Sequence, residues 1–165
     1  MSINMHAALV SLAGLLAFSA PSPVQASGNG PEMRAVERAI RLLPERPMVP
    51  IRVIDPDLAA DPEAVRKVDA FLVREEDGSL RQTIFLNGDS AVLRNAVQGR
   101  QIDIAILAIV IRHEQEHLRG AKEQDARRAE QDFLRRLIRN GRVPPDEGVA
   151  YLNILQTQYG LRVGD

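Results

Sequence analysis

Several residue types and charge patterns are scarce or absent in this chain of 165 residues, and each absence narrows the possible functions. There is no cysteine, which excludes disulfide bonds, thiolate metal ligands and a cysteine nucleophile. Any metal ligand must therefore be a His, Asp or Glu. Trp is absent and aromatic residues make up only 4% of the chain, so Leu, Ile, Val and Ala must build the core. The formal net charge of −1 lacks the basic excess of a nucleic-acid-binding domain.

Long apolar runs are also lacking, except at the N-terminus. Residues 7–20 are apolar, residues 21–23 break the run, and Val24 and Ala26 are the small residues that signal peptidase prefers. This pattern predicts a signal peptide over residues 1–26, although no Lys or Arg precedes the run. A buried helix or an uncleaved anchor is the alternative. The prediction makes the protein secreted or periplasmic, with one mature domain over residues 27–165 and no membrane span after cleavage.

The spacing of apolar residues predicts an α+β fold. Helices are expected over residues 32–43, 91–97, 101–119, 122–140 and 147–159, bounded by Pro, Gly or capping residues. A short strand is expected over residues 49–54, then a loop over residues 55–62. Residues 68–74 and 80–87 flank a turn with Asp77 and Gly78, which predicts a β-hairpin. A small sheet with helices on one side therefore precedes the helix over residues 101–119, whose apolar first half predicts burial.

The C-terminal half of that helix carries an H-E-x-x-H motif formed by His113, Glu114 and His117. Residues four apart lie on the same helix face, so both imidazoles can bind one zinc ion. Glu114 lies about 60° around the helix from His117 and can reach a water on the open side of the metal as a general base. The only other His, His6, lies in the predicted signal peptide. The alternative is an exposed helix end that has this motif by chance.

A zinc site needs a third protein ligand, and the chain offers three candidates. Gly120 permits a sharp turn after His117, and Glu123 follows three residues later, which gives H-E-x-x-H-x-x-G-x-x-E. Metzincins have this spacing with His in the last place, together with a downstream Met. This chain has no Met after the motif. Glu123 is the first candidate ligand, Glu130 the second and Asp125 the third, the last being better suited to bonding a histidine.

The segment over residues 123–129 has the pattern E-x-x-A-x-x-A and resembles the glutamate helix of minigluzincin-type, gluzincin-like peptidases. The resemblance covers roughly residues 71–137. It implies a zincin-like fold in which Glu123 is the third zinc ligand and small Ala residues bring the two helices close. It also implies an edge strand before the metal helix that receives an extended substrate by strand addition, with residues 83–86 as the candidate.

The first functional hypothesis is therefore a zinc-dependent endopeptidase that cleaves a peptide or protein substrate. An exported zinc-binding regulatory protein with little turnover is the alternative, and a structural domain without metal is the third hypothesis. Glu116 is a candidate for bonding a metal ligand, and Tyr151 or Tyr159 for stabilising an oxyanion, although each is more typical of a structural role. The arginines of residues 127–139 alternate with acidic residues, which is typical of a solvated, salt-bridged helix face.

Overall fold

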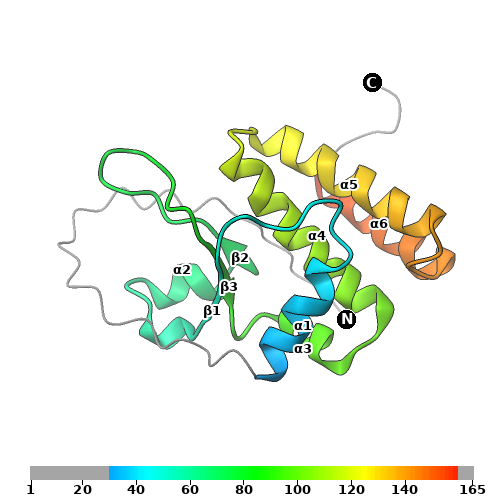
Figure 1. The fold of residues 1–165 in the computed structure, drawn as a ribbon, viewed down its shortest axis with the longest axis horizontal. Coiled ribbons are helices and arrows are strands. Elements are labelled where there is room, and N and C mark those ends of the chain that lie inside the picture. Colours follow the sequence, from blue (N-terminus) through cyan, green and yellow to red (C-terminus); the bar gives the residue numbers. More distant parts are fainter. Residues whose placement is uncertain (1–29, 160–165) are drawn as a thin grey trace.

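The computed structural model of the chain describes residues 30–159 and shows an α+β fold (Figure 1). The predicted signal peptide lies outside the described residues. Between residues 30 and 159, no helix is long and apolar enough to cross a membrane. The helices and strands in chain order are α1 (Pro31–Ile40), β1 (Ile51–Ile54), the 3₁₀ turn η1 (Pro56–Leu58), α2 (Pro62–Arg66), β2 (Ala70–Phe71), β3 (Ile84–Asn87), α3 (Ala91–Gln98), α4 (Gln101–Leu118), α5 (Glu123–Arg139) and α6 (Pro145–Tyr159).

The three strands form one sheet in the order β1-β3-β2. β1 runs parallel to β3, and β2 runs antiparallel to it. The predicted hairpin is confirmed in part, because β2 and β3 are an antiparallel pair that an isolated bridge between Arg74 and Leu80 extends. Of the strand predicted over residues 68–74, only Ala70 and Phe71 pair regularly with β3. The hairpin is therefore shorter and less regular than predicted.

The prediction that residues 83–86 form an edge strand is wrong. β3 has a hydrogen-bonded strand on each side and lies in the centre of the sheet. All four of its residues are buried, as expected for a strand without a free edge. The edges are β1 and β2, and β2 is an edge strand that packs against α4. Any extended ligand must therefore meet a different strand from the predicted one.

The predicted helices are confirmed, with ends that shift by a few residues. The region expected as a loop contains η1, and α2, which the sequence analysis did not predict, begins at its end. Two Asp-Pro steps explain both features. Asp61 accepts a hydrogen bond of 2.9 Å from the backbone N–H of Ala64, and Pro62 occupies the first helical position. Asp55 caps η1 in the same way.

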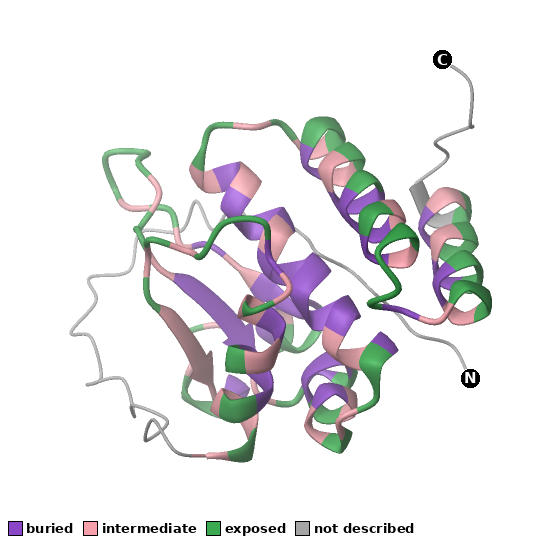
Figure 2. Cartoon of the chain, turned by 45° about the vertical axis from the view of Figure 1, so that its right-hand side comes forward, coloured by how far each residue is buried: buried purple, intermediate pink, exposed green. Residues whose placement is uncertain are grey.

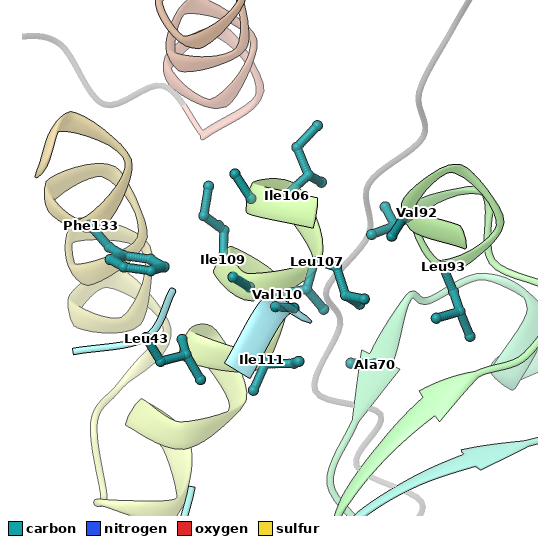
Figure 3. Close-up of a cluster of buried hydrophobic side chains, with 14 of the residues drawn as sticks. Leu43, Ala70, Val92, Leu93, Ile106, Leu107, Ile109, Val110, Ile111 and Phe133 are labelled. Carbon is teal, nitrogen blue, oxygen red and sulfur yellow. The ribbon is translucent and has the colours of Figure 1, made fainter. Parts of the chain in front are cut away.

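α4 lies at the centre of the hydrophobic core and is buried on nearly all sides of its first half, as predicted (Figure 2). Phe133 of α5 packs on one side of it, and Val92 and Leu93 of α3 on the other (Figure 3). Its own side chains Leu107, Ile109 and Ile111 are fully buried. Interiors are packed as densely as organic crystals, so contacts on several sides hold the helix in one position. The residues at its C-terminal end are therefore held on a rigid support.

Replacing Gly148 with alanine is expected to destabilise the protein, although alanine is the better helix former. A Cβ atom at Gly148 would lie 2.5 Å from Cγ1 and 2.8 Å from Cδ1 of Ile138 on α5. Overpacking of this kind costs about 1–3 kcal/mol, more than the roughly 1 kcal/mol that alanine gains in helix propensity. Urea unfolding measures the difference. Adding Ile138→Val, which removes Cδ1, should restore part of the loss. A Gly148→Ala variant as stable as the wild type would show that α5 and α6 can move apart freely.

Candidate metal centre

The residues of the predicted motif lie together at the C-terminal end of α4. His113, Glu114 and His117 are all buried, with exposed fractions of 1%, 3% and 5%. Polar side chains are rarely this buried without a partner or a function. The alternative of an exposed helix end with a chance motif does not fit this burial. The buried part of α4 extends from its apolar first half to these residues, so the motif lies inside the protein and not on its surface.

Three ligand atoms converge next to this helix end. Nε2 of His117 lies 2.9 Å from Nε2 of His113 and 3.1 Å from Oε2 of Glu123. Nε2 of His113 lies 3.6 Å from the same carboxylate oxygen. A tetrahedral zinc ion with bonds of about 2.05 Å separates its ligand atoms by about 3.3 Å, a value within the observed range. His113, His117 and Glu123 therefore form a group that could hold a metal ion, and each offers one atom.

The turn after α4 orients the ring of His117. Gly120 adopts a positive φ of 88°, which a residue with a side chain rarely does, and the chain reverses there. The reversal places the carbonyl oxygen of Ala121 3.0 Å from Nδ1 of His117. A carbonyl only accepts hydrogen bonds, so Nδ1 carries the proton and Nε2 keeps its lone pair for a metal. This backbone partner could not be read from the motif, although Gly120 indicated the turn.

Glu130 orients the other histidine. It is fully buried on α5, and its Oε1 lies 3.0 Å from Nδ1 of His113, the ring nitrogen that the metal group does not use. Glu130 is the second candidate for the third ligand, but its carboxylate lies at Nδ1 of His113, whereas His117 lies at Nε2. A carboxylate in this position is a typical partner of a metal-binding histidine. Glu130 is therefore placed to orient the ring, and Nε2 of His113 is left facing Nε2 of His117 and Oε2 of Glu123.

Arg127 holds the second oxygen of Glu123. Its Nε donates a hydrogen bond of 2.7 Å to Oε1, while Oε2 points to the histidines. This ion pair agrees with the predicted salt-bridged arginine face of the helix, whereas its link to a candidate metal ligand was not predicted. The spacing of four residues was the available signal, since such pairs lie on one helix face. Asp125, the third candidate ligand, is exposed in the first turn of α5.

Glu114 is, with Glu130, one of two buried carboxylates at this site. It is buried, and no residue between 30 and 159 donates a hydrogen bond to it. Burial raises the pKa of Glu114 to about 7, against the effect of His113, which lowers it. A carboxylate whose pKa lies near neutrality, and which has no donor of its own, is suited to take a proton from water and return it.

The charges of the site are closely coupled. Burial lowers the pKa of His113, but the contacts with Glu123 and Glu130 outweigh burial and raise this pKa to about 10. The contact with His113 and, to a smaller extent, the contact with Arg127 lower the pKa of Glu123 to about 2, against the effect of burial. Burial raises the pKa of Glu130. Two unprotonated imidazole nitrogens 2.9 Å apart repel each other, so a proton or a metal cation must lie between them.

The metal-free protein is expected to lose stability as the pH rises. The pKa of His113 is raised from 6.5 to about 10 on folding, so its contribution is complete below pH 6.5 and lost as the pH passes 10. The pKa of Glu114 rises from 4.5 to about 7 on folding, so its contribution to stability is also lost as the pH rises, through pH 7. Melting temperatures in the presence of a chelator, from pH 6 to 10, test this. The His113→Gln variant should show a flatter pH dependence. An equally steep decline in that variant would contradict the expectation.

Of the remaining candidates, Glu116 and Tyr151 lie in structural positions. Glu116 forms ion pairs with Arg112 and Arg119, so its carboxylate is engaged away from the histidines. Tyr151 is buried in the hydrophobic core on α6. The side chain of Tyr159 lies outside the described part of the chain. On the arginine face of α5, Arg135 pairs with Asp132 at 2.9 Å, as predicted for a salt-bridged surface.

Glu123 is the most exposed member of the metal group, with 37% of its side chain exposed, in contrast to the two histidines. A hollow of about 350 Å³ elsewhere, between α1 and α3, is lined by none of the site residues. The candidate site therefore lies where the C-terminal end of α4 meets the start of α5, and that hollow is not part of it.

No protein-family model, curated protein or solved structure matches the chain. The geometry of the site is therefore the basis for any functional conclusion.

Proposed function

We propose that the protein is a zinc-dependent endopeptidase. The observation that carries the proposal is the convergence of Nε2 of His113, Nε2 of His117 and Oε2 of Glu123 beside the buried carboxylate of Glu114. Three protein ligands are the number that leaves a catalytic zinc site one open position. The partners of the other ring nitrogens support a metal function, because such contacts are what metal-binding histidines require.

The donor set favours zinc over other cations. Mg²⁺ and Ca²⁺ prefer oxygen ligands, whereas two of the three donors here are imidazole nitrogens. Two histidines and one carboxylate also hold ferrous iron in oxygenases. Glu114 favours hydrolysis, because a buried carboxylate that can exchange a proton at neutral pH serves the activation of water. The distances of 2.9 to 3.6 Å between the ligand atoms are compatible with a tetrahedral zinc site.

In this proposal a zinc ion supplies a Lewis acid that lowers the pKa of water to about 7 and polarises the peptide carbonyl. Glu114 accepts the proton of the attacking water and then donates it to the nitrogen of the leaving amine. The peptide bond breaks, and the water oxygen stays on the new carboxyl group. One proton of that water reaches the amine nitrogen through Glu114, and the other stays on the carboxyl group until it ionises. Glu130 and the carbonyl of Ala121 keep the histidine rings oriented throughout.

The substrate is an extended peptide that lies between the sheet and the end of α4. β2 replaces β3 as the candidate edge, because it is an edge strand and packs against α4. Ala70 and Leu72 are buried, whereas Val73 is half-buried and Arg74 exposed, so strand addition would involve the chain from Val73 onward. The order of a small sheet, metal helix and glutamate helix supports the proposed zincin-like, minigluzincin-type arrangement. Export by residues 1–26 remains part of the proposal.

The alternative proposal is an exported zinc-binding protein with little turnover. It would need the three ligands and their orienting partners, but not an additional buried carboxylate. Burial of an unpaired Glu is costly, so Glu114 is hard to explain in a site that only binds metal. This observation favours the peptidase.

Cleavage of a peptide library by the zinc-loaded chain of residues 27–165 tests the proposed function. We expect cleavage that stops when a chelator removes the metal and returns with added zinc, because three ligands hold it reversibly. Mass spectrometry of the products gives the bonds cleaved. A protein that binds zinc and cleaves no peptide in a library of all residue types would support the binding protein instead.

A further inference from the structure

The carboxylate of Glu123 has a different partner on each oxygen. Oε2 lies 3.1 Å from Nε2 of His117 and 3.6 Å from Nε2 of His113. Oε1 accepts the hydrogen bond of 2.7 Å from Nε of Arg127. A carboxylate can bind a cation through one oxygen or through both. The group that holds the second oxygen therefore influences how Glu123 can act as a ligand.

We infer that Arg127 is a positioning residue, which fixes the rotamer of Glu123 and keeps it a ligand through one oxygen. The inference rests on the zinc site proposed above and is independent of the substrate. Arg127 follows Glu123 by one turn of α5, so the helix itself brings the two side chains together. Arg127 engages Oε1 and leaves Oε2 directed at the histidines, so the open position of the site is not filled by a second oxygen.

Each of the three proposed ligands then has one orienting partner. His117 has the carbonyl of Ala121, His113 has Glu130, and Glu123 has Arg127. Glu123 needs its partner most, because its side chain is 37% exposed while the histidines are packed into the core. An exposed Glu side chain loses considerable rotamer freedom when it is fixed, and a salt bridge formed before metal binding reduces that cost.

Positioning of Glu123 by Arg127 favours metal binding, whereas the positive charge of Arg127 disfavours it. A guanidinium close to the metal group repels it, so charge alone predicts tighter zinc binding when Arg127 is removed. Positioning predicts weaker binding, typically by 10–100-fold for a partner of a metal ligand. The direction of the change in affinity therefore separates the two effects.

The test compares Arg127→Met with Arg128→Met in the metal-free chain, with zinc added from a competing chelator. Both variants lose one positive charge at neighbouring positions of α5, but Arg128 is exposed and makes no contact with Glu123. We expect zinc affinity to fall at least about tenfold in Arg127→Met and to stay unchanged in Arg128→Met. With cobalt(II) in place of zinc, the visible absorption spectrum should change in Arg127→Met alone, because it reports coordination geometry.

Zinc affinity equal to or tighter than that of the wild type in Arg127→Met, with an unchanged circular dichroism spectrum, would overturn the inference and leave the zinc site intact. A wild-type chain that binds no zinc would overturn both the inference and the proposed function. Because the measurement is metal affinity, a failure to find peptide cleavage would count against the peptidase activity alone.

Discussion

Glu114→Gln is expected to reduce peptide hydrolysis on the order of 10³-fold while the zinc content stays unchanged. Glutamine has nearly the same size, so the buried position remains filled, but its amide cannot accept the proton of the attacking water. Loss of a positioned general base typically costs 10²–10⁴-fold in rate. The measurements are the rate of cleavage of a peptide found in the library search and the metal content of the purified variant. Unchanged zinc with lost activity assigns Glu114 to catalysis rather than to ligation.

Glu116→Gln is the matched control, since it removes a carboxylate from the same motif on the same helix. Glu116 pairs with Arg112 and Arg119 and lies away from the ligand atoms, so hydrolysis should remain close to that of the wild type. A Glu114→Gln variant that still cleaves the peptide at the wild-type rate would show that the proposed mechanism is wrong. Equal losses in both variants would indicate damage to α4 instead of the loss of a base.

His117→Ala is expected to lose the zinc, from about one ion per chain to almost none after dialysis, because two of three ligands do not hold zinc tightly. Glu123→Ala should have the same effect for the same reason. Elemental analysis gives the metal content, and circular dichroism shows whether the variants remain folded. A His117→Ala variant with full zinc would place the metal elsewhere in the protein.

Glu130→Gln and Asp125→Asn separate the three candidate ligands. Glu130 contacts the ring nitrogen of His113 that is not used for ligation, so Glu130→Gln should retain zinc with an affinity lower by about 10–100-fold. Asp125 is exposed, and Asp125→Asn should bind zinc as the wild type does. If Glu123→Ala keeps its zinc and Glu130→Gln loses it entirely, Glu130 is the ligand and Glu123 is not.

Local signals explain why the helices were predictable. Ser90 accepts a hydrogen bond of 3.0 Å from the N–H of Leu93 at the start of α3, and Gly99 follows its last residue. Capping and chain reversal at these positions depend on residues within one turn, so their sequence signature is complete. α2 was missed because a helix of five residues is too short for an apolar repeat.

The sheet was less predictable because strand pairing joins distant segments. The parallel pair of β1 and β3 aligns Ile51 with Ile84, across a separation that includes η1, α2 and β2. The apolar run over residues 84–86 is consistent with a buried strand, but it does not show which strands pair with it. The full burial of β3 distinguishes a central strand, but burial is a property of the packed molecule. The wrong assignment of the substrate-binding edge follows directly from this limit.

The sequence by itself determined the local part of the site. The spacing of His113 and His117 puts both rings on one helix face, and Gly120 turns the chain so that Glu123 comes next to them, because these relations depend on helix geometry and one backbone angle. Only the tertiary structure decided which of Glu123 and Glu130 faces the Nε2 atoms as a candidate ligand and which contacts Nδ1 of His113. Packing of α5 against α4 places Glu130 on Nδ1 of His113 and leaves Oε2 of Glu123 at the Nε2 atoms. Both acids lie on one helix and have the same chemistry, so only the position of that helix against the histidines distinguishes them.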